Sequence, residues 1–479
     1  MLFNSYIFIY VFMPILTGMY RFSVCFNQIV PKLVLCLASI VFYSFMALEY
    51  LPLMLISITA NYLLGSVIDR TRKKVWLISG VVFNLSLIFF FKYYDLVFIH
   101  TLKITSIHWN DIIPLGISFY TFTQIAYLVD TWNGKAHKDK SFISYFLFVT
   151  YFPHLIAGPI LHHKDMLAQF ADKTLYRTDY KNIFQGLIFF VTGLSKKILL
   201  ADNLIPYVKP VFQAVAQGEH VYPLECWCGI LAYSFQLYFD FSGYSDMAIG
   251  ISKFFNFDLP KNFASPYKAF NIIEFWRRWH MSLSAFLRDY LYIPLGGNRK
   301  GKLRRHANLI ITMAIGGMWH GANWTFLFWG LYHGLLLVAN HLLSSTRKIS
   351  RSMGGGKVGF TFFLVLLGWV LFRSESLSAA ISYYKYLFNV QELFIIPDGW
   401  KNLEQKLPFP VSPMPYFFGK SEIAFIAMCA VIAFFFPNSQ ETVEKHGNPR
   451  MWILISLFLT FLVCLYKMDD LSEFIYFQF

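Results

Sequence analysis

The sequence predicts an all-α integral membrane protein that crosses the bilayer many times. Of its 479 residues, 56% are hydrophobic and only 14% are charged. A chain this poor in charge cannot cover the surface of a water-soluble fold, which excludes a globular protein. Apolar runs close to the roughly 20 residues that span a bilayer recur along the chain, and we predict about ten to twelve spans with re-entrant or interfacial helices between them.

Thirteen apolar runs are the candidate spans, some of them too short or too interrupted to cross. The first run has neither a positively charged start nor a small-residue cleavage site, so we expect a span and not a removed signal peptide. Asn61 and Asn84, inside such runs, are expected to hydrogen-bond between helices. Lys196 and Lys197 interrupt another run, which we expect to bend at the membrane interface. The runs lie near residues 5–20, 33–48, 51–68, 75–91, 112–129, 142–161, 183–200, 221–239, 307–318, 322–343, 358–372, 421–436 and 451–466.

The net charge of +14 is spread over short basic clusters between the apolar runs. This pattern indicates membrane topology and not nucleic-acid binding, and the clusters at 69–74, 299–305 and 347–357 are predicted to be cytoplasmic. Three runs precede the first cluster, which would place the N-terminus outside. The six cysteines show no metal-ligand spacing, and no metal site is expected.

Two runs carry polar features that suggest more than a lipid-facing role. The segment at 112–130 has polar side chains at steps of three and four residues, which we expect to face a wet cavity or the bundle interior. Pro153 and Pro159 break the run at 142–161 around His154. His154 could have a function, or it could simply be a polar residue beside a kink.

Asp240 and Asp246 lie in a segment that is otherwise fit for lipid. Carboxylates at such depth need partners, and Arg277, Arg278 or a histidine could supply them. The segment could therefore be part of a functional site or hold a buried ion pair between helices.

The stretch at 271–334 is the predicted functional centre. It contains two Trp-His pairs, Trp279-His280 and Trp319-His320, on either side of a basic loop. His320 lies in an apolar run, where an imidazole costs free energy unless it is paired or faces water. Chemistry alone explains it equally well as a helix-packing residue. The arginines beside the first pair suit an interfacial helix whose cations meet headgroups or an anionic ligand.

Four motifs stand out in this stretch: FWRRWHMSLS at 275–284, RDYLYIPLGGN at 288–298, GMWHGANW at 317–324 and WGLYHG at 329–334. They resemble the membrane-bound O-acyltransferases, and most closely the bacterial branch that O-acetylates alginate and peptidoglycan. The resemblance covers the whole chain and includes PHLIAGP at 153–159 and DFSGYSD at 240–246.

The resemblance implies about eleven transmembrane helices, with re-entrant and interfacial helices, around a central cavity where the bilayer is locally thinned. It implies a multi-pass protein of the bacterial cytoplasmic membrane, surrounded by lipid. We expect a single membrane domain over 1–479, with scaffold helices at 1–110, a catalytic core at 111–345 and C-terminal helices at 346–479.

The family histidine corresponds to His320, and the second polar position corresponds to His280. The resemblance implies that an acetyl group from acetyl-CoA, on the cytoplasmic side, is passed to a hydroxyl, with an extracytoplasmic SGNH-type partner completing transfer to a polysaccharide. Acyl transfer needs a base at the nucleophile and a donor at the developing oxyanion. His320, neutral in apolar surroundings, could be the base or a covalent acyl carrier.

Other side chains are candidates for supporting roles, and no bound cofactor is expected besides the acetyl-CoA donor. The candidates for orienting the substrate, stabilising the oxyanion or supporting the histidines are His280, Trp319, Asn323, Asp240, Asp246 and His154. The CoA phosphates would need cations, although topology signalling alone would also explain basic residues here. The cation candidates are Arg277, Arg278, Arg299, Lys300 and Lys302.

Three other functions stay open. A sibling branch transfers D-alanine to teichoic acid from a carrier protein in place of CoA, and a lipid-modifying acyltransferase is a weaker sibling. A polysaccharide or proton-coupled transporter would also bury His and Asp among broken helices. It should show internal repeats, however, and the two halves of this sequence have no matching interrupted segments.

Overall fold

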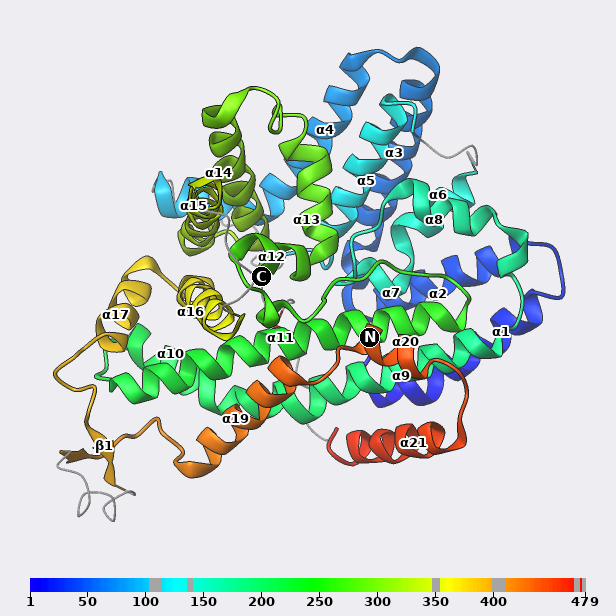
Figure 1. Ribbon diagram of the computed structural model, residues 1–479. Helices are drawn as coiled ribbons and strands as arrows, with labels where there is room; N and C mark the ends of the chain where they lie inside the picture. Colours follow the sequence, from blue (N-terminus) through cyan, green and yellow to red (C-terminus); the bar gives the residue numbers. More distant parts are fainter. Residues whose placement is uncertain (103–112, 136–140, 347–353, 399–409, 469–473, 476–479) are drawn as a thin grey trace. The chain divides into compact units, whose positions relative to one another are not determined.

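The computed structural model describes residues 1–102, 113–135, 141–346, 354–398, 410–468 and 474–475. Their regular structure is almost entirely helical, which confirms the predicted fold class, and each of the thirteen predicted runs contains a helix (Figure 1). Within the described residues, β1 (Ile396–Pro397) and β2 (Val411–Ser412) form a short parallel pair. The chain divides into two compact units.

Unit 1 comprises Met1–Ser195, Gly243–Asn262 and Ser439–Gln478. It includes the C-terminal part of the long helix α11 (Pro223–Phe254). Its other helices are α1 (Met13–Ser23), α2 (Ile29–Ala47), α3 (Leu51–Thr71), α4 (Lys74–Ile88), α5 (Ile117–Trp132), α6 (Phe142–Thr150), α7 (Phe152–Leu155), α8 (His163–Ala171), α9 (Tyr180–Ser195), α20 (Ser439–His446) and α21 (Met451–Tyr466).

Unit 2 comprises Lys196–Ser242 and Phe263–Asn438, and so includes the N-terminal part of α11. These boundaries differ from the division expected from the sequence, and the single-domain division stays a prediction. The other helices of unit 2 are α10 (Ile205–Gln217), α12 (Ile272–Arg278), α13 (Met281–Leu287), α14 (Gly301–His320), α15 (Trp324–Thr346), α16 (Gly354–Arg373), α17 (Leu377–Leu387) and α19 (Lys420–Phe435).

Short 3-10 and π-helical turns extend or join these helices. They lie at Phe8–Phe12, Leu48–Tyr50, Phe89–Tyr93, Asp95–Thr101, Lys173–Leu175, Lys196–Ala201, Asp202–Leu204, Pro266–Lys268 and Arg288–Tyr292.

Several helical segments have the length and composition of membrane spans. Helices α19 and α20 together also pass this test, while α11 and α14 are long enough but are not among the segments whose composition qualifies. The chain is therefore a polytopic membrane protein by composition, although the predicted number of about eleven spans is not confirmed. The five segments that qualify among the described residues are Ile29–Thr71, Lys74–Tyr93, Tyr180–Gln217, Trp324–Leu343 and Gly355–Arg373.

Buried amides join helices in unit 1, as predicted. The Asn61 Nδ2 of α3 donates to Asn84 Oδ1 at 3.2 Å, and the Asn84 Nδ2 of α4 donates back to Asn61 Oδ1 at 2.7 Å. On α5 the polar side chains are also buried, and the Gln124 oxygen accepts a hydrogen bond from the Ser57 hydroxyl of α3. The polar stripe predicted on this segment therefore faces the interior of the unit.

The predicted break at 142–161 is present. Helix α6 ends at Thr150, Tyr151 adopts a non-helical conformation, and α7 is a single turn. His154 lies on this turn, and its Nε2 donates to the Phe148 carbonyl oxygen at 3.0 Å. The broken backbone is covered by protein, because the residues from Tyr151 to Leu161 are buried.

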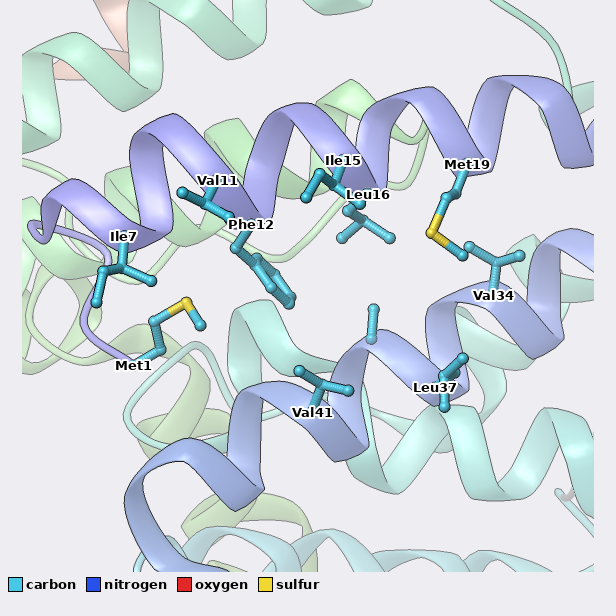
Figure 2. Close-up of a pocket in the computed structure, with 11 residues that line it drawn as sticks. Met1, Ile7, Val11, Phe12, Ile15, Leu16, Met19, Val34, Leu37 and Val41 are labelled. Atoms are coloured by element: carbon cyan, nitrogen blue, oxygen red, sulfur yellow. The ribbon is translucent and has the colours of Figure 1, made fainter.

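Unit 1 has apolar grooves that suit hydrocarbon and not polar chemistry. Figure 2 shows one of about 280 Å³, between the first helical segment and α2, lined by side chains such as Phe12, Leu16, Met19 and Val41. A second groove of about 450 Å³ is lined by α9, α21 and neighbouring apolar residues. The side chains that line both grooves are apolar, so the grooves suit hydrocarbon chains.

Candidate active site

Helices α14 and α15 form an antiparallel hairpin that positions His320, and they lie side by side in Figure 1. Along the hairpin Gly334 faces Ile310, and a Cβ atom at Gly330 would lie 2.3 Å from the Met313 carbonyl oxygen. Glycine permits this close approach of the two backbones, as small residues do in membrane helix pairs. His320 is the last residue of α14, so its imidazole lies at the turn of the hairpin.

Aromatic rings surround the imidazole of His320. Its side chain is 5% exposed. The ring centroids of Trp319, Trp329 and Phe372 lie 5.0, 5.2 and 5.2 Å from its own. Phe372 comes from α16, so three helices build the surroundings of His320. These rings keep bulk water away from the imidazole.

His280, the second predicted imidazole, lies in a strained turn between α12 and α13. Its backbone has φ 43° and ψ 53°, a left-handed conformation that costs a non-glycine residue about 1–3 kcal/mol. The side chain is fully buried and lies edge-on to Phe241, with ring centroids 4.7 Å apart. The centroids of His280 and His320 are 6.3 Å apart. The structure therefore brings together the two histidines predicted to carry the chemistry.

Trp319 lies close to both histidines, whereas the Asn323 side chain forms hydrogen bonds with backbone groups. The Trp319 ring centroid is 6.0 Å from that of His280. The Asn323 Oδ1 accepts a hydrogen bond from Thr325 N, and its Nδ2 donates to the Glu375 carbonyl oxygen at 2.7 Å. Asn323 thus caps the start of α15 and links it to Glu375, which follows the end of α16. Its role at the oxyanion stays a prediction.

The structure gives Asp240 a partner that the sequence analysis did not name. Asp240 forms an ion pair with Lys197, with Nζ and Oδ1 2.8 Å apart, and Lys197 also reaches Asp202 at 2.9 Å. The Lys197 and Asp240 side chains are 1% and 2% exposed. Lys197 is thus buried, and the expected bend at the membrane interface stays a prediction. A buried lysine between two carboxylates is stable because its charge is compensated.

His154 and Asp246 belong to unit 1, whereas His280 and His320 belong to unit 2. Asp246 is buried and accepts a hydrogen bond from the hydroxyl of Ser439. His154 bonds within its own broken segment, as described above. Their predicted support of the two histidines stays a prediction.

The two arginines of α12 differ in their surroundings. Arg278 pairs with Glu274 at 2.7 Å and donates to the Ala264 carbonyl oxygen. Arg277 is exposed and acts electrostatically on His341 of α15. Arg277 is therefore the more available of the two for an anionic ligand.

Arg299, Lys300 and Lys302 are exposed at the beginning of α14. The turn before them is fixed by Asn308, whose Nδ2 donates to the Gly297 carbonyl oxygen at 3.0 Å. From Lys302 to His320 the helix rises about 27 Å, at about 1.5 Å per residue. These cations and His320 thus lie at opposite ends of α14, and only an extended donor could connect them.

Sequence reasoning gave no role to three further residues, which contact one another and reach His320 through Trp329. Trp276 and Trp329 contact each other with ring centroids 5.7 Å apart, and both contact a third buried histidine, His333. All three lie in motifs that carry the resemblance. Their position in the motifs could have marked them as candidates. Nothing else in their apolar segments distinguishes them from ordinary core residues.

Comparison with known proteins identifies the family. A model described as MBOAT, membrane-bound O-acyltransferase family, matches residues 75–373, which include every candidate residue named above. The chain belongs to the membrane-bound O-acyltransferase family. It is therefore an acyltransferase of the membrane, as the motifs predicted.

Individual relatives narrow the comparison. A peptidoglycan O-acetyltransferase of Helicobacter pylori is 44% identical over 420 residues, with 80% of this chain and 79% of the relative covered. A probable alginate O-acetylase, AlgI, of Pseudomonas aeruginosa is 40% identical over 408 residues, with 81% and 75% covered. A teichoic acid D-alanyltransferase of Streptococcus thermophilus is 32% identical over 238 residues, with 47% and 56% covered. This O-acyltransferase is thus similar over most of its length to O-acetylating enzymes.

Proposed function

We propose that this O-acyltransferase moves acetyl groups from acetyl-CoA, at the cytoplasmic side, to an extracytoplasmic polysaccharide such as peptidoglycan or an alginate-like exopolysaccharide. It would act in the bacterial cytoplasmic membrane. The observation that carries the proposal is the pair of buried imidazoles, His280 and His320, with ring centroids 6.3 Å apart. The names of the relatives that share most of the chain support acetyl as the group transferred.

His320 would act as the general base. An unprotonated ring nitrogen of His320 would take the proton of the acceptor hydroxyl while the oxygen attacks the thioester carbonyl. The tetrahedral intermediate collapses to the acetyl ester and releases the CoA thiolate, which takes the proton back from the imidazolium. His280 and the Trp319 indole N–H would donate to the oxyanion or orient the acceptor.

A covalent route uses the same residue. His320 would attack the thioester carbonyl itself, forming an acetyl-imidazole and releasing CoA as the thiol. The acceptor hydroxyl would then take the acetyl group and return the ring to its neutral form. Trapping an acetylated His320 in the absence of acceptor would distinguish this route from general-base catalysis.

The hairpin geometry supports a direction for the transfer. The basic residues at the start of α14 and the predicted cytoplasmic clusters would lie on the donor side, with His320 at the far end of the helix. An SGNH-type partner outside the membrane would complete the transfer to the polysaccharide.

The test is replacement of His320 in cells that lack their own copy of the protein. His320→Ala should insert normally but reduce polysaccharide O-acetylation by about 10²- to 10⁴-fold, the contribution of a general base. His220→Ala is the matched control, since His220 is an exposed histidine of unit 2 paired with Glu392. Wild-type acetylation in the His320→Ala strain would contradict the proposal.

D-alanyl transfer is the competing function, supported by the teichoic acid D-alanyltransferase relative. Purified protein incubated separately with acetyl-CoA and with a D-alanyl carrier protein would distinguish the two. Acyl transfer from the carrier protein, with no binding or turnover of acetyl-CoA, would replace the proposed donor.

A further inference from the structure

His333 is a third buried histidine of unit 2, and the proposed chemistry gives it no role. It lies on α15, one helical turn after Trp329, and its side chain is 0% exposed. An imidazole in such a place costs free energy unless its nitrogens find partners. Its contacts therefore indicate what it does.

A hydrogen bond from Trp276 fixes the orientation of His333. The Trp276 Nε1–H donates to the Nδ1 of His333 at 3.3 Å. An indole N–H can only donate, so Nδ1 accepts and the neutral ring carries its proton on Nε2. Trp276 lies on α12, which leads through Trp279 into the strained turn at His280. The bond thus ties α15 to the segment that holds the second imidazole of the site.

Trp329 connects His333 to His320. Its ring centroid lies 5.0 Å from that of His333 and 5.2 Å from that of His320. Trp276 approaches the same indole at 5.7 Å, and Trp369 of α16 stacks on it at 5.9 Å. Any movement of His333 or Trp276 would shift the indole that forms one wall of His320.

Helix α16 holds His333 from the other side. A Cβ atom at Gly368 would lie 2.8 Å from the Nε2 of His333, so only glycine leaves room for the imidazole. Among the described residues, this Nε2 has no hydrogen-bond partner. A residue needed only to fill space would be better served by an apolar ring, which buries no unpaired donor.

We propose that His333 is a positioning residue for acyl transfer. Held by the Trp276 N–H and by the backbone at Gly368, it fixes Trp329 against His320 and so sets where the reacting imidazole lies. This inference rests on the proposed function, in which His320 is the residue that reacts.

The test compares two replacements of His333 in purified protein, with acetyl-CoA as donor. His333→Phe keeps an aromatic ring but loses the acceptor for Trp276, so kcat should fall by about 10- to 100-fold through misplacement of His320. KM for acetyl-CoA should stay unchanged, because a positioning role exerted through Trp329 and His320 does not involve binding of the donor. His333→Asn can offer an amide oxygen near the position of Nδ1, and it should recover most of the lost kcat.

A pair of glycine variants on α16 tests the same contact from the opposite side. Gly368→Ala should push on His333 and lower kcat, again with unchanged KM. Gly359→Ala is the matched control on the same helix, because a Cβ atom there meets no neighbour within 4 Å. This pair decides the question if His333→Phe fails to insert.

The outcomes separate the inference from the proposed function. Wild-type kcat in both His333→Phe and Gly368→Ala, while His320→Ala is inactive, would overturn the positioning role alone. A loss in His333→Phe that His333→Asn does not relieve would also overturn it. If His320→Ala is fully active, the proposed function itself fails.

Discussion

At the scale of single residues, Arg277 and Arg278 are adjacent in the sequence but differ in their contacts. The Arg278 guanidinium pairs with Glu274 and donates a hydrogen bond to the Ala264 carbonyl oxygen, whereas Arg277 is exposed. The sequence predicted both as contacts to the CoA phosphates, because it shows the charge but not the partner. Because its guanidinium is exposed, Arg277 is the better candidate for a contact to the CoA phosphates.

Arg277→Gln should weaken the binding of CoA to the purified protein by about 3- to 10-fold. A charge-assisted contact contributes about 1.5–3 kcal/mol, and exposure to solvent reduces this. Affinity should also fall as salt rises, since exposed charges are screened over about 8 Å at physiological ionic strength. Calorimetric titration of CoA measures both effects.

The control for this prediction is Arg288→Gln. Arg288 is an exposed arginine of unit 2 whose guanidinium is already paired with Asp289. The Arg288→Gln substitution removes the same charge as Arg277→Gln but does not remove a guanidinium that is available to bind CoA. Equal weakening by both variants would show that general positive charge, and not Arg277, attracts CoA.

Residue chemistry explains which parts of the site could be predicted. His320 stands out in the sequence because an imidazole is costly in an apolar segment, and His280 was predicted from the motif that resembles the family. His333 has the same chemistry, but its importance depends on rings from α12 and α16 that only the folded chain brings to it. The sequence and its resemblance therefore predicted His280 and His320 as site residues but gave no role to His333.

At the scale of helices, the apolar runs in the sequence predicted where helices form but not which helices pack against one another. Every predicted run contains a helix, since the run length itself requires one in a bilayer. The partner of Asp240 depends on which segment packs against α11. It proved to be Lys197, on a π-helical turn that continues α9.

Lys197→Met should lower the free energy of unfolding in detergent by about 3–5 kcal/mol, because it leaves the Asp240 carboxylate buried without its counter-charge. Adding Asp240→Leu should recover part of this loss, since an apolar pair can replace a buried ion pair. A thermal unfolding midpoint for each variant measures the effect. Lys196→Met is the control on the adjacent, less buried position. Equal destabilisation by both single variants would contradict a specific role of the ion pair.

At the scale of the molecule, the geometry of unit 2 bears on the direction of transfer. Helices α14 and α15 are antiparallel. Phe326, near the start of α15, contacts Phe372 near the end of α16, whereas Tyr332, further along α15, bonds to the earlier residue Leu364, so α16 runs antiparallel to α15. The beginning of α16 is therefore at the same end as Lys302, and Glu375 is at the end that holds His320. If basic clusters are cytoplasmic, the chemistry lies toward the far side of the membrane.

This arrangement predicts opposite labelling of two exposed positions. In a Cys25→Ser background, which removes the exposed cysteine among the six, Lys302→Cys should be shielded from a membrane-impermeant maleimide added to intact cells. Glu375→Cys should react, because α16 is a candidate span that separates it from the basic cluster at its start. Permeabilised cells provide the control, in which both positions should label. Labelling of Lys302→Cys from outside would reverse the donor side, and equal labelling of both positions in intact cells would mean that α16 does not cross the bilayer.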